Sequence, residues 1–227
     1  AASYLYKRQL RDNRDMYLDE NKKYLQDKSK TGGLAVGVPG TIAGIFKAHK
    51  RFGSLPMQTI LRPVILLAKN GFKITEKQAK QFNDYSAVFK QVNQENSIYT
   101  KKFKAGDVFK NKALASTLQQ ISDNGRSAFY QGEIAKTLVA FLQKNNGIFS
   151  LKDLDNYQAI WREPIVFNYK DLRIISMSPP SSGGLCMAQI LKTTANYPIA
   201  QYGHNTTKTI QVLTEAQRRA YADRSNY

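Results

Sequence analysis

The sequence is poor in the residues on which most metal and thiol sites depend. Its 227 residues include one cysteine, Cys186, and two histidines, His49 and His204. A single cysteine excludes an internal disulfide and a multi-cysteine metal site, and two histidines without a paired-carboxylate motif argue against other metal sites. Because Cys186 lies in an apolar helical pattern, we expect it to be a small buried side chain.

Long apolar runs and nucleotide-binding motifs are also missing. No stretch approaches the roughly 20 apolar residues that a membrane-spanning helix needs. No glycine-rich turn leads to a Lys-Ser/Thr pair, and Gly32, Gly33, Gly37 and Gly40 miss the dinucleotide-binding spacing. The composition is 42% hydrophobic, which is too apolar for a disordered chain, so a packed fold is expected.

Negative charge is scarce, because 34 lysines and arginines stand against 17 acidic residues, a formal charge of +17. Such an excess suggests nucleic acid, an anionic surface or an acidic partner subunit. The basic residues are dispersed, however, and no zinc-finger or RNA-recognition signature accompanies them. A solvated basic surface is therefore favoured over nucleic-acid binding, which stays open as an alternative.

Neither end of the sequence has a typical start or stop signal. The chain opens without an initiator methionine or a signal-like apolar segment, and it stops within a helical pattern at ADRSNY. We expect it to be a piece of a longer protein.

Helical periodicity dominates the first part of the chain. One helix is predicted from Thr41 to a stop at Gly53. After Pro56, an apolar run contains Pro63, which predicts two short helices or one kinked helix, closed by Gly71.

Capping signals predict the helices that follow. Thr75 and Gln78 have capping-box spacing, and Asn111 can cap a helix that ends at Asn124-Gly125. Another helix should end at Asn146-Gly147. The side chains expected to face inward are Leu114, Leu118 and Ile121 in the helix capped by Asn111. In the helix that ends at Asn146-Gly147 they are Ile134, Leu138 and Phe141.

The pattern changes after Ser150, which is expected to cap a short turn. Two β-rich runs flank Tyr169-Lys170-Asp171 and predict a β-hairpin, followed by the SPPSSGG loop at 178–184 and two helices. Helices, hairpin and helices in this order indicate a single α+β domain over 1–227. In the first of these two helices, the side chains expected to face inward are Leu185, Ala188 and Leu191 or Lys192. The second helix is expected to begin at Asn205 or Thr206. Its inward side chains are expected to be Ile210, Leu213, Ala216 or Gln217 and Ala220.

The SPPSSGG loop contains candidate nucleophiles, Ser181 and Ser182, which would need a nearby base. His49 lies among apolar helix residues and is expected to be structural, whereas His204 lies in a Gly-His-Asn loop, and a triad with Ser182 stays open. The loop is favoured as a structural junction in which Gly183 and Gly184 allow close backbone passage or positive φ.

Two carboxylate pairs do not indicate a metal site. Asp153 with Asp155, and Asp12 with Asp15, lie among turn and cap signals, so they are expected to be helix-start residues. The residues alone therefore predict a scaffold-rich α+β chain without a complete catalytic set.

Several segments resemble the gamma-glutamyltransferase (gamma-glutamyltranspeptidase, glutathione hydrolase) family. They are NRDMYLD at 13–19, GGLAVGVPGTIAGIFKAHKRFGSLP at 32–56, PVILLAKNGFKI at 63–74, SMSPPSSGG at 176–184 and EAQRRAYADRSNY at 215–227. Their order and spacing match the family along nearly the whole chain, within the C-terminal two thirds of the large subunit.

The resemblance implies an αββα N-terminal nucleophile hydrolase, made as a precursor that cuts itself into a large and a small subunit. The N-terminal threonine of the small subunit attacks a γ-glutamyl amide such as that of glutathione, without metal or organic cofactor. The nucleophile would then lie outside this chain. The family's substrate-binding arginine belongs to an Arg-Glu-x-Ala-Pro motif that is absent here, and Arg8 and Arg11 do not match it. No site residue is therefore assigned.

The resemblance also implies a periplasmic or secreted location and a small-subunit partner. Two alternatives stay open. One is a relative that acts on β-lactam side chains or poly-γ-glutamate, and the other is a non-catalytic basic module that binds nucleic acid or another polyanion.

Overall fold

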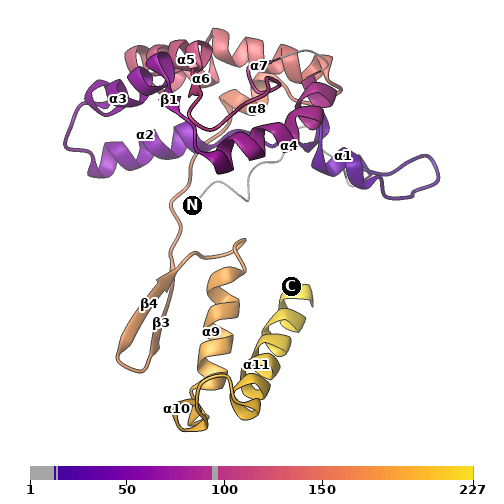
Figure 1. Ribbon diagram of the computed structural model, residues 1–227, viewed down its shortest axis with the longest axis vertical. Coiled ribbons are helices and arrows are strands. Elements are labelled where there is room, and N and C mark those ends of the chain that lie inside the picture. Colours follow the sequence, from indigo (N-terminus) through magenta and orange to yellow (C-terminus); the bar gives the residue numbers. More distant parts are fainter. Residues whose placement is uncertain (1–12, 14, 94–96, 227) are drawn as a thin grey trace. The chain divides into compact units, whose positions relative to one another are not determined.

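A computed structural model describes residues 13, 15–93 and 97–226. Their contacts form two compact units, one that runs up to Ala159 and one that begins at Ile160 (Figure 1). We call them the helical unit and the C-terminal unit. The single domain expected over 1–227 stays a prediction, because two contact units can belong to one domain.

The helical unit consists of helices and one small sheet. Its two short strands pair antiparallel, Phe72 with Phe109 and Lys73 with Val108. In order the elements are α1 (Gln26–Lys30), η1 (Gly33–Ala35), α2 (Thr41–Phe52), α3 (Met57–Asn70), β1 (Phe72–Lys73), α4 (Glu76–Asn93), β2 (Val108–Phe109), α5 (Lys112–Asn124), α6 (Arg126–Tyr130), α7 (Glu133–Lys144) and α8 (Leu151–Asp155).

The main core of this unit is organised around Tyr130, which is 1% exposed. Its hydroxyl donates to the Pro39 carbonyl at 2.7 Å and accepts from the Ala43 N–H at 3.1 Å. Ala43 lies in the first turn of α2, where backbone N–H groups have no partner within the helix. Tyr130 therefore fixes the Val-Pro-Gly turn to the start of α2. The core residues are Val38, Ala43, Tyr130, Ala135, Val139, Leu142, Phe149, Leu154, Tyr157 and Ala159.

An aromatic cluster forms a second core between α4 and β2. The Phe82 ring stacks on Phe109 at 5.1 Å between centroids and packs against Phe103 at 4.9 Å. The N-terminus of α4 has the predicted capping box, in which Gln78 Oε1 accepts from the Thr75 N–H and Thr75 Oγ1 accepts from the Gln78 N–H. This cap sets where α4 begins beside the cluster.

Two glycines distant in sequence let backbone segments touch. A Cβ atom on Gly33 would lie 2.6 Å from both the Asn145 carbonyl oxygen and the Gly147 nitrogen. A Cβ on Gly147 would lie 2.7 Å from the Leu142 oxygen and 3.1 Å from the Gly33 oxygen. Since every one of these contacts is to backbone, no side-chain movement could make room for a larger residue.

The C-terminal unit is the predicted hairpin followed by helices. Strands β3 (Ile165–Tyr169) and β4 (Leu172–Ser176) pair antiparallel, with Phe167 opposite Ile174. The hairpin is followed by α9 (Gly183–Thr194), α10 (Ile199–Tyr202) and α11 (Thr207–Asn226), and α9 lies beside α11 (Figure 1). Helices with short antiparallel sheets confirm the α+β class.

Pro63 does not divide its helix. Helix α3 runs from Met57 to Asn70 with Pro63 inside it, so the two-helix alternative is wrong. Gly71 ends the helix at φ +85°, as its position predicted. Within the described residues, no helix has both the length and the apolarity that crossing a membrane requires.

The inward face of α7 was predicted only in part. Ala135, Val139 and Leu142 are buried, whereas Phe141 is 38% exposed. The observed stripe has the same helical spacing as the predicted one but is shifted by one residue, which is about 100° around the helix. Leu138 packs half-buried against the core as predicted, and Ile134 is also half-buried, but the fully buried positions begin with the small Ala135.

The other predicted faces are right in part. On α5 Ile121 is buried as expected, but Leu114 is 45% exposed. On α9 the buried residues are Gly184, Cys186 and Thr194, and Leu185 is exposed. On α11 Ala216 and Ala220 are buried as predicted, and Ile210 is 51% exposed. The buried residues on α9 and α11 are mostly small, so the two helices can approach closely. A prediction that places the large apolar side chains inward misses such a contact.

Candidate functional site

The SPPSSGG loop joins β4 to α9 and is held by backbone contacts. The Arg162 guanidinium donates to the Pro179 carbonyl at 2.7 Å, and the Ser181 N–H donates to the Ser178 carbonyl at 3.3 Å. The Ser182 carbonyl accepts from the Cys186 N–H at 2.9 Å, which starts the α9 hydrogen-bond ladder. These contacts are those of a structural connection between strand and helix.

The two glycines of the loop differ in their surroundings. A Cβ on Gly184 would lie 2.7 Å from the Met177 oxygen and 3.1 Å from the Ser176 Cβ. A Cβ on Gly183 would meet nothing closer than Ser181 Oγ at 3.6 Å, and neither glycine has positive φ. Close backbone passage is therefore confirmed for Gly184, while the positive-φ alternative is wrong for both.

Neither candidate serine is hydrogen-bonded to a base within residues 13, 15–93 and 97–226. Ser181 and Ser182 are half-buried in the loop, and His204 is exposed in the turn before α11. Among the described residues, no hydrogen bond joins His204 to either serine. The local structure offers no general base to these hydroxyls.

His49 and Cys186 have structural surroundings. The His49 Nε2 lies 2.7 Å from the Leu55 carbonyl oxygen, so the imidazole joins the end of α2 to the segment that precedes α3. Cys186 is 8% exposed, and its Sγ lies 3.9 Å from the Ala220 carbonyl oxygen of α11. Both residues match the structural roles predicted for them.

Of the carboxylates predicted to lie at helix starts, Asp153 does and Asp155 does not. Ser150 and Asp153 form a capping box at the start of α8, which confirms Asp153 as a helix-start residue. Asp155 lies instead at the end of α8, where its carboxylate accepts from Gln131 Nε2 at 2.7 Å. The Asp15 carbonyl closes a turn with the Leu18 N–H, and Asp12, Arg8 and Arg11 lie outside the described residues.

No group of three or more His, Cys, Asp or Glu residues is arranged to hold a metal ion within residues 13, 15–93 and 97–226. Two basic side chains that line a shallow pocket instead hold backbone carbonyls. Lys47 donates to the Ala159 carbonyl, and Arg126 donates to the Tyr157 carbonyl while lying over the Tyr130 ring. These cations fix the last residues of the helical unit.

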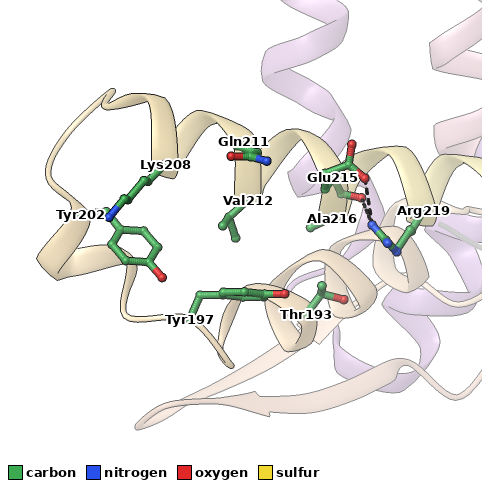
Figure 2. Close-up of a pocket in the computed structure, with 9 residues that line it drawn as sticks. All are labelled: Thr193, Tyr197, Tyr202, Lys208, Gln211, Val212, Glu215, Ala216 and Arg219. Carbon is green, nitrogen blue, oxygen red and sulfur yellow. Dashed lines mark hydrogen bonds and ion pairs between the residues drawn. The ribbon is translucent and has the colours of Figure 1, made fainter.

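A larger groove of about 530 Å³ lies within the C-terminal unit, between α11 and the segment that links α9 to α10 (Figure 2). Its α11 residues recur at helical spacing on one face, and only Ala216 among them belongs to the stripe that the sequence predicted to be buried. The lining residues are Thr193, Tyr197, Tyr202, Lys208, Gln211, Val212, Glu215, Ala216 and Arg219.

Comparisons with known proteins cover nearly the whole chain. Residues 10–227 match the family model described as gamma-glutamyltranspeptidase. The glutathione hydrolase proenzyme of Escherichia coli is 37% identical over 218 residues, which are 94% of this chain and 38% of that protein. The Acylase ACY 1 proenzyme of Pseudomonas sp. strain V22 is 32% identical over 86% of this chain and 35% of its own length.

A solved structure has the same fold. The crystal structure of Helicobacter pylori gamma-glutamyltranspeptidase superimposes with a TM-score of 0.92 at 37% identity, covering 97% of this chain and 64% of that chain. The chain thus spans under two fifths of the curated relatives it matches. The neighbours are N-terminal nucleophile hydrolases, in agreement with the predicted fold class. On sequence and structure alike, the chain belongs to the gamma-glutamyltranspeptidase family.

Proposed function

We propose that this chain is the C-terminal two thirds of the large subunit of an enzyme that transfers or hydrolyses γ-glutamyl groups, with glutathione and related compounds as substrates. The observation that carries the proposal is the family match over residues 10–227. The partial coverage of relatives named proenzymes supports a precursor that supplies a second, small subunit.

In the proposed mechanism, an N-terminal threonine of the small subunit attacks the γ-glutamyl amide. Its free α-amine serves as the general base for its own hydroxyl, so the reaction needs no histidine. The acyl group then passes to water or to an amino acid or peptide. The structural roles of His49 and Cys186 agree with a nucleophile outside this chain.

In the same proposal this chain supplies scaffold and cleft walls, in a periplasmic or secreted heterodimer. The Val-Pro-Gly turn orients α2, and the SPPSSGG loop connects the hairpin to α9. Both segments are held by contacts within their own unit, as expected of supports for a site completed by another chain.

A comparison of the isolated chain with the full-length protein tests the proposal directly. The 227 residues alone should not release the anilide from a γ-glutamyl anilide, and the full-length protein should. The gene should encode a threonine at the start of a Thr-Thr-His or Thr-Thr-Ser type segment downstream of Tyr227. Turnover by the isolated chain, or an open reading frame without such a threonine, would refute the proposed division of labour.

A relative that cleaves another amide is the alternative within the family, and the acylase match supports it. Measuring release from a γ-glutamyl anilide, a β-lactam side-chain amide and poly-γ-glutamate with the same preparation decides between the substrates. The highest kcat/KM identifies the preferred acyl group.

The charge of +17 supports a second candidate, a polyanion-binding module. Such a module should bind DNA measurably, and its affinity should fall steeply as salt rises, because cations are released from the phosphates. Binding that stays undetectable at low salt removes this candidate.

Ser182→Ala tests whether the SPPSSGG loop takes part in chemistry. Because Ser182 has no bonded base, acyl transfer by the full-length protein should stay within about tenfold of the parent, roughly 1.4 kcal/mol. The measurement is kcat/KM for a γ-glutamyl anilide. A thousandfold loss with folding intact would show that the loop is catalytic.

A further inference from the structure

The groove of the C-terminal unit is positively charged along its α11 side. Glu215 Oε2 accepts from Arg218 at 2.8 Å and from Arg219 at 3.0 Å, so two guanidinium groups share one carboxylate. Lys208 has no hydrogen bond or ion pair within the part of the chain that the structure describes, and its Nζ lies 5.9 Å from the centroid of the Tyr202 ring. Among the side chains that line the groove, Arg219 is paired with Glu215, so the excess positive charge lies at the Lys208 end.

The groove also has an aromatic wall opposite an aliphatic one. Figure 2 shows the Tyr197 ring edge-on, with one face turned toward Val212 on α11, and the Tyr202 ring at the end where Lys208 lies. Tyr197 borders the groove and is 47% exposed, so part of the residue is open to contact with a ligand. A planar group fits between a tyrosine face and aliphatic side chains, where offset stacking stabilises it.

The polar groups along the groove are available to a ligand. Neither tyrosine hydroxyl, nor the Lys208 amine, nor the Gln211 amide hydrogen-bonds to another described residue. A concave volume of about 530 Å³ lies within the range of small-molecule sites, which combine apolar walls with a few such polar groups. Lys208 and Arg219 are about 16 Å apart along the helix axis, since each residue rises 1.5 Å.

We propose that this groove binds a small aromatic carboxylate, with the ring between Tyr197 and Val212 and the carboxylate at Lys208. A neutral ring would lose the attraction to Lys208, and an aromatic amine would meet two basic side chains of the groove, Lys208 and Arg219, against the single carboxylate of Glu215. This proposal can be tested independently of the γ-glutamyl reaction, because the experiment measures ligand binding and not turnover.

Isothermal titration of the full-length protein with three matched probes tests the proposal. Indole-3-acetate should bind saturably, indole-3-acetamide about three- to fivefold more weakly, and tryptamine more weakly still, because one exposed ion pair contributes a modest factor. Added salt should weaken the binding of the acetate and leave the acetamide unchanged. Equal affinity for all three probes, or no saturable binding of the acetate, overturns the proposal.

Two variants locate the site. Lys208→Gln should weaken indole-3-acetate about three- to fivefold and leave the acetamide unaffected, and Tyr197→Ala should weaken both probes about five- to tenfold. The matched controls are Lys192→Gln and Tyr221→Ala, which change exposed residues of α9 and α11 that do not line the groove. Control variants that weaken binding as much as the groove variants would place the ligand elsewhere.

Discussion

Tyr130→Phe is expected to lower the free energy of unfolding by about 2–4 kcal/mol, because two buried backbone groups lose their partner. The Tyr130 hydroxyl serves both the Pro39 carbonyl and the Ala43 N–H, and phenylalanine keeps the ring while removing both contacts. Urea denaturation of the full-length protein, followed by circular dichroism, measures the change.

Tyr157→Phe is the matched control for this variant. The two rings stack with centroids 5.9 Å apart, but the Tyr157 hydroxyl makes no hydrogen bond with a described residue. Its removal should change stability by less than about 0.5 kcal/mol. Equal effects of the two substitutions would show that the shared aromatic stack, and not the hydroxyl of Tyr130, stabilises this core.

Alkaline pH provides a second measurement on Tyr130. Burial is the largest cause that raises the pKa of Tyr130 above 10.0, and burial also raises the pKa of Tyr157. Since the unfolded chain ionises first, the stability linked to each neutral phenol is complete below pH 10 and is lost as pH rises through the folded pKa. Tyr130→Phe should therefore flatten the fall in stability above pH 10.

Gly184→Val is expected to destabilise the protein by about 3 kcal/mol and to reduce the yield of mature protein. The valine Cβ would lie 2.7 Å from the Met177 carbonyl oxygen, and the end of β4 would have to move away from the first turn of α9. Thermal unfolding and the fraction of precursor that is processed are the measurements.

The neighbouring glycine offers a matched control. Gly183→Val places the same side chain one residue earlier in the same helix, where the nearest atom is Ser181 Oγ at 3.6 Å. Its effect should stay within about 1 kcal/mol, since valine and glycine differ little in helix propensity. If both variants fold and mature normally, close backbone contact at Gly184 is not needed for the fold.

Local signals predicted the ends of the elements well. The Thr75-Gln78 capping box, the Asn111 cap and the turn at Lys170 depend on residues within a few positions of one another, so the sequence displays them directly. The positions of the hairpin and of the major helices followed from these signals.

Contacts between distant segments were not predictable in the same way. Tyr130 bonds to residues 91 and 87 positions away, and nothing in its own segment indicates those partners. The shift of the buried face of α7 by one residue has the same origin, because Ala135 is buried by the side chains of other segments in the core. The groove at Tyr197 and Lys208 depends on how α9, α10 and α11 pack, so the helical spacing of α11 alone did not reveal it.

The touching backbones at Gly33 and Gly147 constrain how this chain can change over evolution. A methyl group on either glycine would collide with backbone atoms of the other segment. Because the colliding atoms are backbone, no second substitution to a smaller side chain could relieve the collision. A mutational library that varied the two codons together should return glycine at both among all folded clones. We therefore expect the two glycines to be kept together, although 113 residues of chain separate them.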